Sequence, residues 1–279
     1  MRSLIVALVA GLLQGIVEWL PVSSKSMIGL VFVDGGGFSN NTAYVMGLLA
    51  NFGSFFAALY YFRADIFEAL RGLRSPFGKT VEAMKLRYLV IATFATALVG
   101  LPIYAAVVHV FHRSAGAVFM GAVGLFLLAT TVINRRRERM AARGANGKYE
   151  VPGAGGSAIV GAAQGLAALP GVSRSAVTVT PLLMMGESPA AALRFSFLLD
   201  VVGLLGAGLT PFLVGHAGFS ALHQVGSTDM ILMIVVAAVV SFLAIDVMLR
   251  VASRLRSSTV TLALGLVTLA GAVLYASGI

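Results

Sequence analysis

Two short stretches of the chain hold polar and charged side chains in otherwise apolar surroundings, and one of them has the composition of a phosphate site. In it, Leu-Pro-Gly-Val leads into Ser173, Arg174 and Ser175, with Thr178 one helical turn later. A guanidinium fork, hydroxyl groups and the free N–H groups of a new helix all bind phosphate oxygens. These four residues are therefore candidate phosphate ligands. A structural ion pair between Arg174 and Glu18 is the alternative.

The other stretch, residues 14–26, carries Glu18, Ser23, Ser24 and Lys25 between two apolar runs. A carboxylate in such a place could act as a general base, or could hold a divalent cation such as Mg²⁺ or Ca²⁺ together with a substrate. The two serines are either helix caps or, beside that base, a candidate nucleophile.

Broken helices must present both stretches, because each contains a proline between apolar runs. Leu20-Pro21 lies between Leu4–Leu13 and Met27–Val33, and the residue before a proline avoids helical geometry. Non-helical backbone at membrane depth survives only where it lines a cavity or is buried in protein. We therefore predict that residues 3–34 and about 156–186 each form a re-entrant helix–loop–helix, which enters the bilayer and turns back.

The composition indicates one integral membrane domain over residues 1–279. Hydrophobic residues make up 58% of the chain and charged residues only 11%, with a mean hydropathy of +0.94. The net charge of +9 does not indicate a nucleic-acid partner, because fifteen of the twenty Lys and Arg residues lie in 63–87, 135–148 and 250–256, between apolar runs. That bias is typical of cytoplasmic loops. The chain has no cysteine, which excludes disulfides and cysteine metal sites.

Six further stretches are long enough to span about 30 Å of hydrocarbon. They are Asn41–Phe62, Tyr88–Val110, Ala115–Ile133, Ala191–Val214, Met230–Leu249 and Thr259–Ser277. If the three basic segments are inside, residues 215–229 and both termini lie outside. The segment 3–34 then enters and leaves from the outer face.

The two broken stretches are related by an internal repeat. At an offset of 150, Gln14-Gly15 falls on Gln164-Gly165, and the Leu-Pro and Val-Ser pairs nearly coincide. An odd number of crossings separates the copies, so they enter from opposite sides, as in the inverted repeats of secondary transporters. We therefore predict an all-α polytopic membrane protein with two inverted repeats, about 1–134 and 155–279, joined by a basic cytoplasmic loop at 135–154. Each repeat is a re-entrant helix–loop–helix followed by three transmembrane helices.

The motifs resemble those of the undecaprenyl-diphosphatase family, also called BacA and connected with bacitracin resistance. The similarity rests on Gln14-x-x-x-Glu18 with Leu-Pro-Val-Ser-Ser, on Leu-Pro-Gly-Val-Ser-Arg174-Ser-x-x-Thr178, and on Arg194-Phe-Ser-Phe-Leu-Leu. It implies a multi-pass phosphatase of the cell membrane that removes one phosphate from a polyprenyl diphosphate on the outer side, with help from a divalent cation. This reaction recycles the lipid carrier for cell-wall and glycan synthesis. The oligomeric state stays open.

The resemblance also implies roles for particular residues. Glu18, Ser24 and Arg174 would be catalytic, with Glu18 as the possible metal ligand. Gln14, Ser23, Ser173, Ser175 and Thr178 would bind the substrate.

The chain departs from the family pattern at Met27, where the family generally carries a histidine three residues after the second serine. A thioether cannot transfer a proton, so that work would fall on Glu18, or on Asp200 within a later span. Asp200 could instead form an ion pair with Arg194, although their spacing suits one poorly. The Arg194 side chain itself is expected to snorkel to the cytoplasmic surface. The loss of the histidine favours a second hypothesis, a transporter or flippase for a polyprenyl phosphate or another anionic lipid.

Overall fold

The chain folds as a bundle of helices. The computed structural model describes residues 2–19, 24–113, 116–143, 150–214, 217–252 and 257–276, and every regular element among them is a helix. Within these ranges, four helical stretches are apolar and long enough to cross a membrane: Asn40–Tyr61, Val81–Val110, Pro189–Leu213 and Ser227–Val247. They coincide with four of the six predicted spans, and the all-helical membrane class is confirmed.

The helices follow the order expected from the sequence. The first half contains α1 (Arg2–Val17), α2 (Ser24–Leu30) with a short π-helical extension (Val31–Gly35), α3 (Asn40–Leu49), α4 (Asn51–Tyr61), α5 (Arg63–Arg71), α6 (Val81–Arg113) and α7 (Gly116–Arg143). The second half contains α8 (Ala154–Gly165), α9 (Arg174–Met184), α10 (Pro189–Leu213), α11 (Ala217–Val225), α12 (Ser227–Ala252) and α13 (Ser257–Ala276). Short 3₁₀ turns follow α5 (Gly72–Arg74) and α8 (Leu166–Ala168).

Both predicted helix breaks are present. Helix α1 ends at Val17 and α2 begins at Ser24, although the turn at Leu20-Pro21 and the side chain of Ser23 lie outside the described residues. In the second break, Leu169 is extended (φ −67°, ψ 134°), as the residue before a proline should be. Gly171 follows with φ +87°, a conformation that side chains other than glycine rarely adopt. The chain thus reverses within a few residues before α9 starts.

Several segments predicted as loops are partly helical, which corrects the sequence-based boundaries. The basic segment 63–87 contains α5 and the start of α6, the segment 215–229 that was predicted to lie outside contains α11, and α7 continues through the basic residues to Arg143. The last case has a clear cause. Glu138 on this extension accepts hydrogen bonds from the backbone N–H and the hydroxyl of Ser258, at 2.9 and 2.7 Å, so the extension holds the start of α13.

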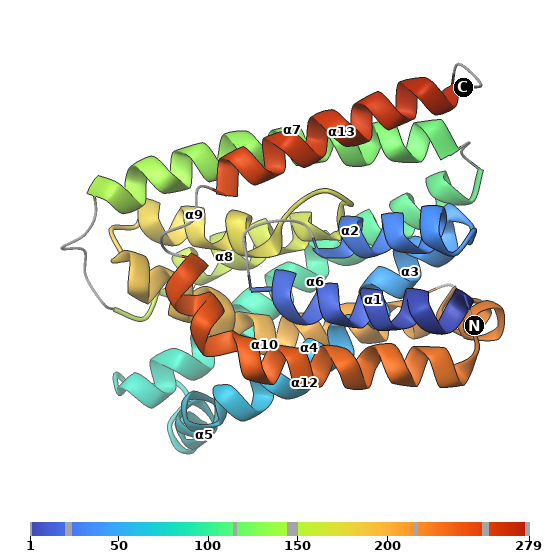
Figure 1. Ribbon diagram of the computed structural model, residues 1–279. Coiled ribbons are helices and arrows are strands. Elements are labelled where there is room, and N and C mark those ends of the chain that lie inside the picture. Colours follow the sequence, from blue (N-terminus) through green and yellow to red (C-terminus); the bar gives the residue numbers. More distant parts are fainter. Residues whose placement is uncertain are drawn as a thin grey trace.

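The predicted span Asn41–Phe62 is also not one uninterrupted helix. It is divided between α3 and α4, and the division falls at Ala50. Helices α7 and α13, which correspond to the remaining two predicted spans, lie side by side along one edge of the bundle (Figure 1).

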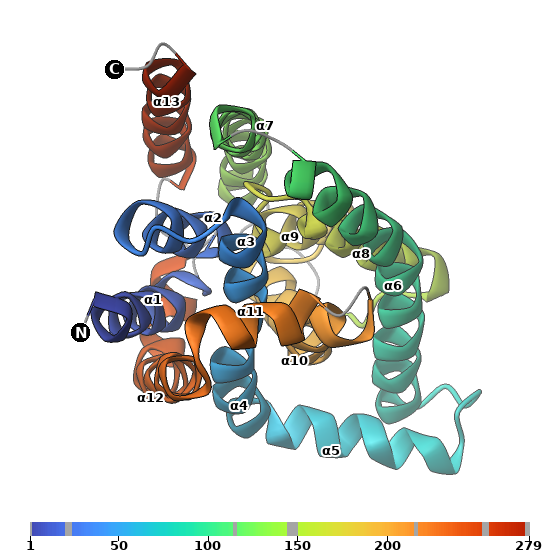
Figure 2. The same cartoon turned by 90° about the vertical axis from the view of Figure 1, so that its right-hand side faces the viewer.

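Two helix pairs flank the middle of the bundle, where α9 and α10 lie (Figure 2). Helix α1 packs along α12 and α8 along α6. Glycines permit both close approaches: an added Cβ would lie 2.7 Å from the Met233 carbonyl oxygen at Gly11 and 2.1 Å from the Ala92 carbonyl oxygen at Gly161. These two glycines stand 150 residues apart, the same offset that relates the two motifs.

The largest buried cluster joins the end of α1 to α10. Trp19 is fully buried and meets the Phe197 ring edge-on, with ring centroids 5.7 Å apart. Aromatic pairs in this geometry add stability beyond the area that they bury. The contact holds the residue next to Glu18 against the helix that carries Asp200.

Candidate functional site

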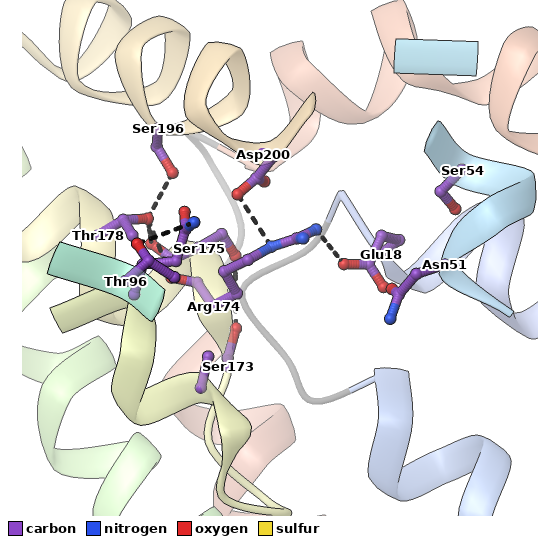
Figure 3. Close-up of polar contacts among 12 residues, drawn as sticks. Glu18, Asn51, Ser54, Thr96, Ser173, Arg174, Ser175, Thr178, Ser196 and Asp200 are labelled. Carbon is purple, nitrogen blue, oxygen red and sulfur yellow. Dashed lines mark hydrogen bonds and ion pairs between the residues drawn. The ribbon is translucent and has the colours of Figure 1, made fainter. Parts of the chain in front are cut away.

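Arg174 connects the two broken stretches, because it reaches from the first turn of α9 to the end of α1 (Figure 3). Its Nη2 donates to Glu18 Oε1, and its Nε lies 2.9 Å from Asp200 Oδ1 on α10. The ion pair between Arg174 and Glu18, which the sequence offered as the alternative to a phosphate site, is therefore present. It does not exclude a role in binding, because Arg174 also lines a cavity.

Asp200 and Arg194 do not pair with each other. Asp200 is fully buried against Arg174, whereas the half-exposed Arg194 binds Asp65 of α5, with Nη2 and Oδ2 2.7 Å apart. Arg194 is thus held by a carboxylate as well as partly solvated. The reason is tertiary, since α5 lies across the cytoplasmic end predicted for α10 and brings Asp65 within reach.

Glu18 also meets the candidate nucleophile. Ser24 Oγ donates to Glu18 Oε2 at 2.5 Å, so a hydroxyl and a carboxylate from the two sides of the first break are in direct contact. Gln14, one turn earlier on α1, donates to the same oxygen at 2.8 Å and to Asn51 Oδ1 at 3.2 Å. A serine hydroxyl hydrogen-bonded to an oriented carboxylate is the arrangement that activates an oxygen nucleophile.

A cavity of about 290 Å³ opens beside these groups. The charged groups of its lining and three hydroxyls beside them come from the two breaks: Glu18, Ser24, Lys25, Ser173, Arg174 and Ser175. Further polar side chains in the wall are those of Tyr44, Asn51, Thr93, Thr96, Tyr104, Gln164 and Thr210. The remaining wall, from α3, α6 and α10, is largely apolar, with Leu48, Leu101, Val202, Leu205 and Leu209. Such a site suits a ligand with an anionic head and an apolar chain.

Two of the predicted substrate-binding residues support this lining rather than form it. Gln14 holds Glu18, as described above. Thr178 donates to the Arg174 carbonyl oxygen at 2.9 Å, and its hydroxyl is 2.5 Å from that of Ser196 on α10. Ser173 and Ser175 do line the cavity, and Ser173 precedes α9 without a capping hydrogen bond from its side chain. Their hydroxyls are 3.4 Å apart.

Several polar residues at the site had no predicted role. Asn51 and Ser54 of α4 accept hydrogen bonds from Gln14. Thr96 of α6 accepts one from Gln164, whose amide lies over Gly203 of α10. Each is a buried or half-buried polar residue within an apolar helix. That pattern, which marks functional positions in membranes, could have identified them.

The fit of a divalent cation can be judged from the donor groups. Within the described ranges, no three or more His, Cys, Asp or Glu side chains lie close enough to hold a metal ion. Glu18 could contribute one carboxylate ligand, and Mg²⁺ is commonly held by one or two carboxylates together with substrate phosphates and water. The site therefore fits a cation that arrives with a phosphate ligand.

Comparison with known proteins agrees with the resemblance seen in the motifs. The family described as bacitracin resistance protein BacA matches residues 7–268. Proteins named undecaprenyl-diphosphatase from Saccharolobus solfataricus and Haloarcula marismortui are 34% and 33% identical to the chain, over 98% and 99% of it and over 97% and 100% of the relatives. A relative of the same name from Pyrobaculum aerophilum is 36% identical over 96% of this chain and 97% of its own. The chain therefore belongs to the bacitracin resistance protein BacA family.

Proposed function

We propose that this protein is a membrane phosphatase that hydrolyses undecaprenyl diphosphate to undecaprenyl phosphate and phosphate, and so recycles the lipid carrier for cell-wall or glycan synthesis. The observation that carries the proposal is the contact of Ser24, Glu18 and Arg174 at the polar lining of a cavity with apolar walls. The names of the relatives support the same activity.

The geometry supports a reaction in two steps. Ser24 Oγ attacks the terminal phosphorus, the bond from phosphorus to the bridging oxygen breaks, and Glu18 passes the hydroxyl proton to the departing undecaprenyl phosphate. Water then attacks the phosphoserine, and Glu18 takes a proton from it and returns one to Ser24 Oγ. Arg174, Ser173, Ser175 and the free N–H groups at the start of α9 bind the transferred phosphoryl oxygens.

The departure at Met27 is compatible with this scheme. Ser24 already touches Glu18, so its proton has an acceptor without a histidine one turn further along α2. Met27 itself is not among the described residues that line the cavity. A divalent cation such as Mg²⁺ or Ca²⁺, held by Glu18 with the substrate phosphates, would supply charge neutralisation.

The activity is tested with purified protein and undecaprenyl diphosphate, with undecaprenyl phosphate as the control substrate. We expect one phosphate to be released per diphosphate and none from the monophosphate. A parallel reaction with a chelator decides whether a cation takes part. Transport of labelled undecaprenyl phosphate across a bilayer, with no phosphate release, would replace the phosphatase with the transporter or flippase.

We further propose that the two halves are inverted repeats and that the cavity is reached from outside the cell membrane. The pairing of α1 with α12 and of α8 with α6 supports this, because each broken segment packs on a helix of the other half. The matching glycines at these two contacts support it as well.

Cysteine labelling tests this topology, because the chain has no cysteine of its own. Ser220 on α11 and Ser75 between α5 and α6 are both exposed. In intact cells, an impermeant maleimide should label Ser220→Cys and spare Ser75→Cys, because the basic segments belong on the cytoplasmic side. Both should react after permeabilisation. Labelling of Ser75→Cys in intact cells would contradict the assigned orientation.

A further inference from the structure

Lys25 is a cavity-lining cation without a carboxylate partner. Among the described residues, the only other Lys or Arg in the lining is Arg174, which is in direct contact with both Glu18 and Asp200. The Lys25 ammonium group donates to the carbonyl oxygen of Ala167, and no carboxylate in the described part of the chain lies within ion-pair distance of it.

The carboxylates of Glu18 and Asp200 act on this ammonium group only from beyond ion-pair distance, and the partner that it contacts directly is a neutral carbonyl. Burial in an apolar bundle removes water from the charge, and a neutral carbonyl replaces only part of that stabilisation. Lysine has three N–H donors, and one of them points to Ala167. The ammonium group therefore keeps donors for a ligand in the cavity that Lys25 lines together with Ser24 and Arg174.

The fold places this side chain between the two breaks. Lys25 directly follows Ser24 in the first turn of α2, and Ala167 belongs to the 3₁₀ turn that leads into the second break. Gly47 of α3 holds the backbone of Lys25 closely, since a Cβ on Gly47 would lie 3.0 Å from the Lys25 carbonyl oxygen. The ammonium group is therefore presented at a defined place in the cavity, beside the turn that precedes the second break.

We infer that Lys25 binds one phosphate of the diphosphate head while Arg174 and the start of α9 bind the other. This inference rests on the proposed function, because it takes a polyprenyl diphosphate as the ligand. On binding, the ammonium group exchanges the Ala167 carbonyl for phosphate oxygens and gains an anion in direct contact. Lys25 thus favours a diphosphate over a monophosphate, which can occupy only one of the two positions.

Binding measurements on purified full-length protein test the inference. The probes are a methylene-bridged analogue of undecaprenyl diphosphate, which cannot be hydrolysed at the bridge, and undecaprenyl phosphate. Fluorescence of Trp19, the single tryptophan, reports binding from beside Glu18. Lys25→Met should weaken binding of the analogue about 10-fold or more, as expected when a hydrogen bond to a charged group is lost. Binding of the monophosphate should change less than about 3-fold, and Lys25→Arg should retain most of the affinity for the analogue.

Matched controls separate this role from a structural one. Lys79→Met removes a lysine from the exposed segment before α6 and should leave both affinities unchanged. If Lys25→Met is not recovered folded, Lys25→Gln, which keeps a donor for Ala167, replaces it with the same expectation. Equal weakening for both lipids, or unchanged affinity for the analogue, would overturn the inference. If the wild type binds the analogue through Lys25 but releases no phosphate from the true substrate, the proposed function fails and the role of Lys25 stands.

Discussion

Glu18→Gln is expected to lower phosphate release from undecaprenyl diphosphate by about 10²–10⁴-fold, the range over which a general acid or base contributes to catalysis. The substitution is nearly isosteric, so the side chain can still accept from Ser24 or Gln14, but it can no longer take a proton. Arg174 keeps Asp200 as an ion partner, so the protein should still fold and insert. Initial rates for the purified variant, with a melting curve for the same sample, measure both effects.

A carboxylate outside the cavity provides the control for Glu18. Glu82 lies in the first turn of α6, and Glu82→Gln should retain the wild-type rate. If Glu18→Gln also released phosphate at the wild-type rate, Glu18 would not be the base. Ser24 would then be a phosphate contact rather than a nucleophile that this carboxylate activates.

Arg174→Lys should lower phosphate release from undecaprenyl diphosphate nearly as much as Arg174→Ala does. We expect losses of about 10²–10³-fold or more, as for removal of a donor that stabilises transition-state charge. The guanidinium reaches Glu18 through Nη2 and Asp200 through Nε at the same time, and its planar fork can also face a phosphate. A lysine keeps the charge but has a single nitrogen, so it cannot hold both carboxylates and a phosphate in this geometry. Phosphate release by the two variants is the measurement.

Folding has to be separated from catalysis at this position. Arg174→Ala leaves Asp200 buried without a cation, a loss that typically costs about 3–5 kcal/mol, whereas Arg174→Lys retains a positive charge beside it. The lysine variant is therefore the informative one, provided that it melts near the wild-type temperature. Arg194→Lys is the matched control, because Arg194 pairs with Asp65 away from the cavity and should tolerate the change. Recovery of most of the turnover in Arg174→Lys would make Arg174 a point charge or a structural partner.

Local patterns in the sequence were sufficient for the helices and for the two breaks. Apolar runs of spanning length can be satisfied only as helices in hydrocarbon, and Leu-Pro pairs within them interrupt the backbone hydrogen bonds wherever they occur. The boundaries near the surfaces were less accurate. The charged residues up to Arg143 are compatible with either helix or loop, and only contacts such as Glu138 with Ser258 decide between them.

The candidate site shows the same division. Glu18, Ser24 and Arg174 could be selected from the sequence because charged and hydroxyl groups at a break in an apolar helix require partners. The pair of Arg174 with Glu18 was one of two interpretations open from the sequence, whereas its second partner, Asp200, 26 residues further along the chain, was not predicted. Asp200 pairs with Arg174 and not with Arg194 because of the way in which α9 packs against α10.

The sequence by itself determined the membrane class, the broken helices and the family, because each of these follows from residue types at fixed local spacing. Only the tertiary structure decided that Gln14 and Thr178 lie behind the cavity and that Lys25 faces it without a carboxylate. The physical reason is that compensation of a buried charge depends on distances between helices. Those distances are set by close contacts such as Gly161 on Ala92 and Gly47 on Lys25, which no local pattern encodes.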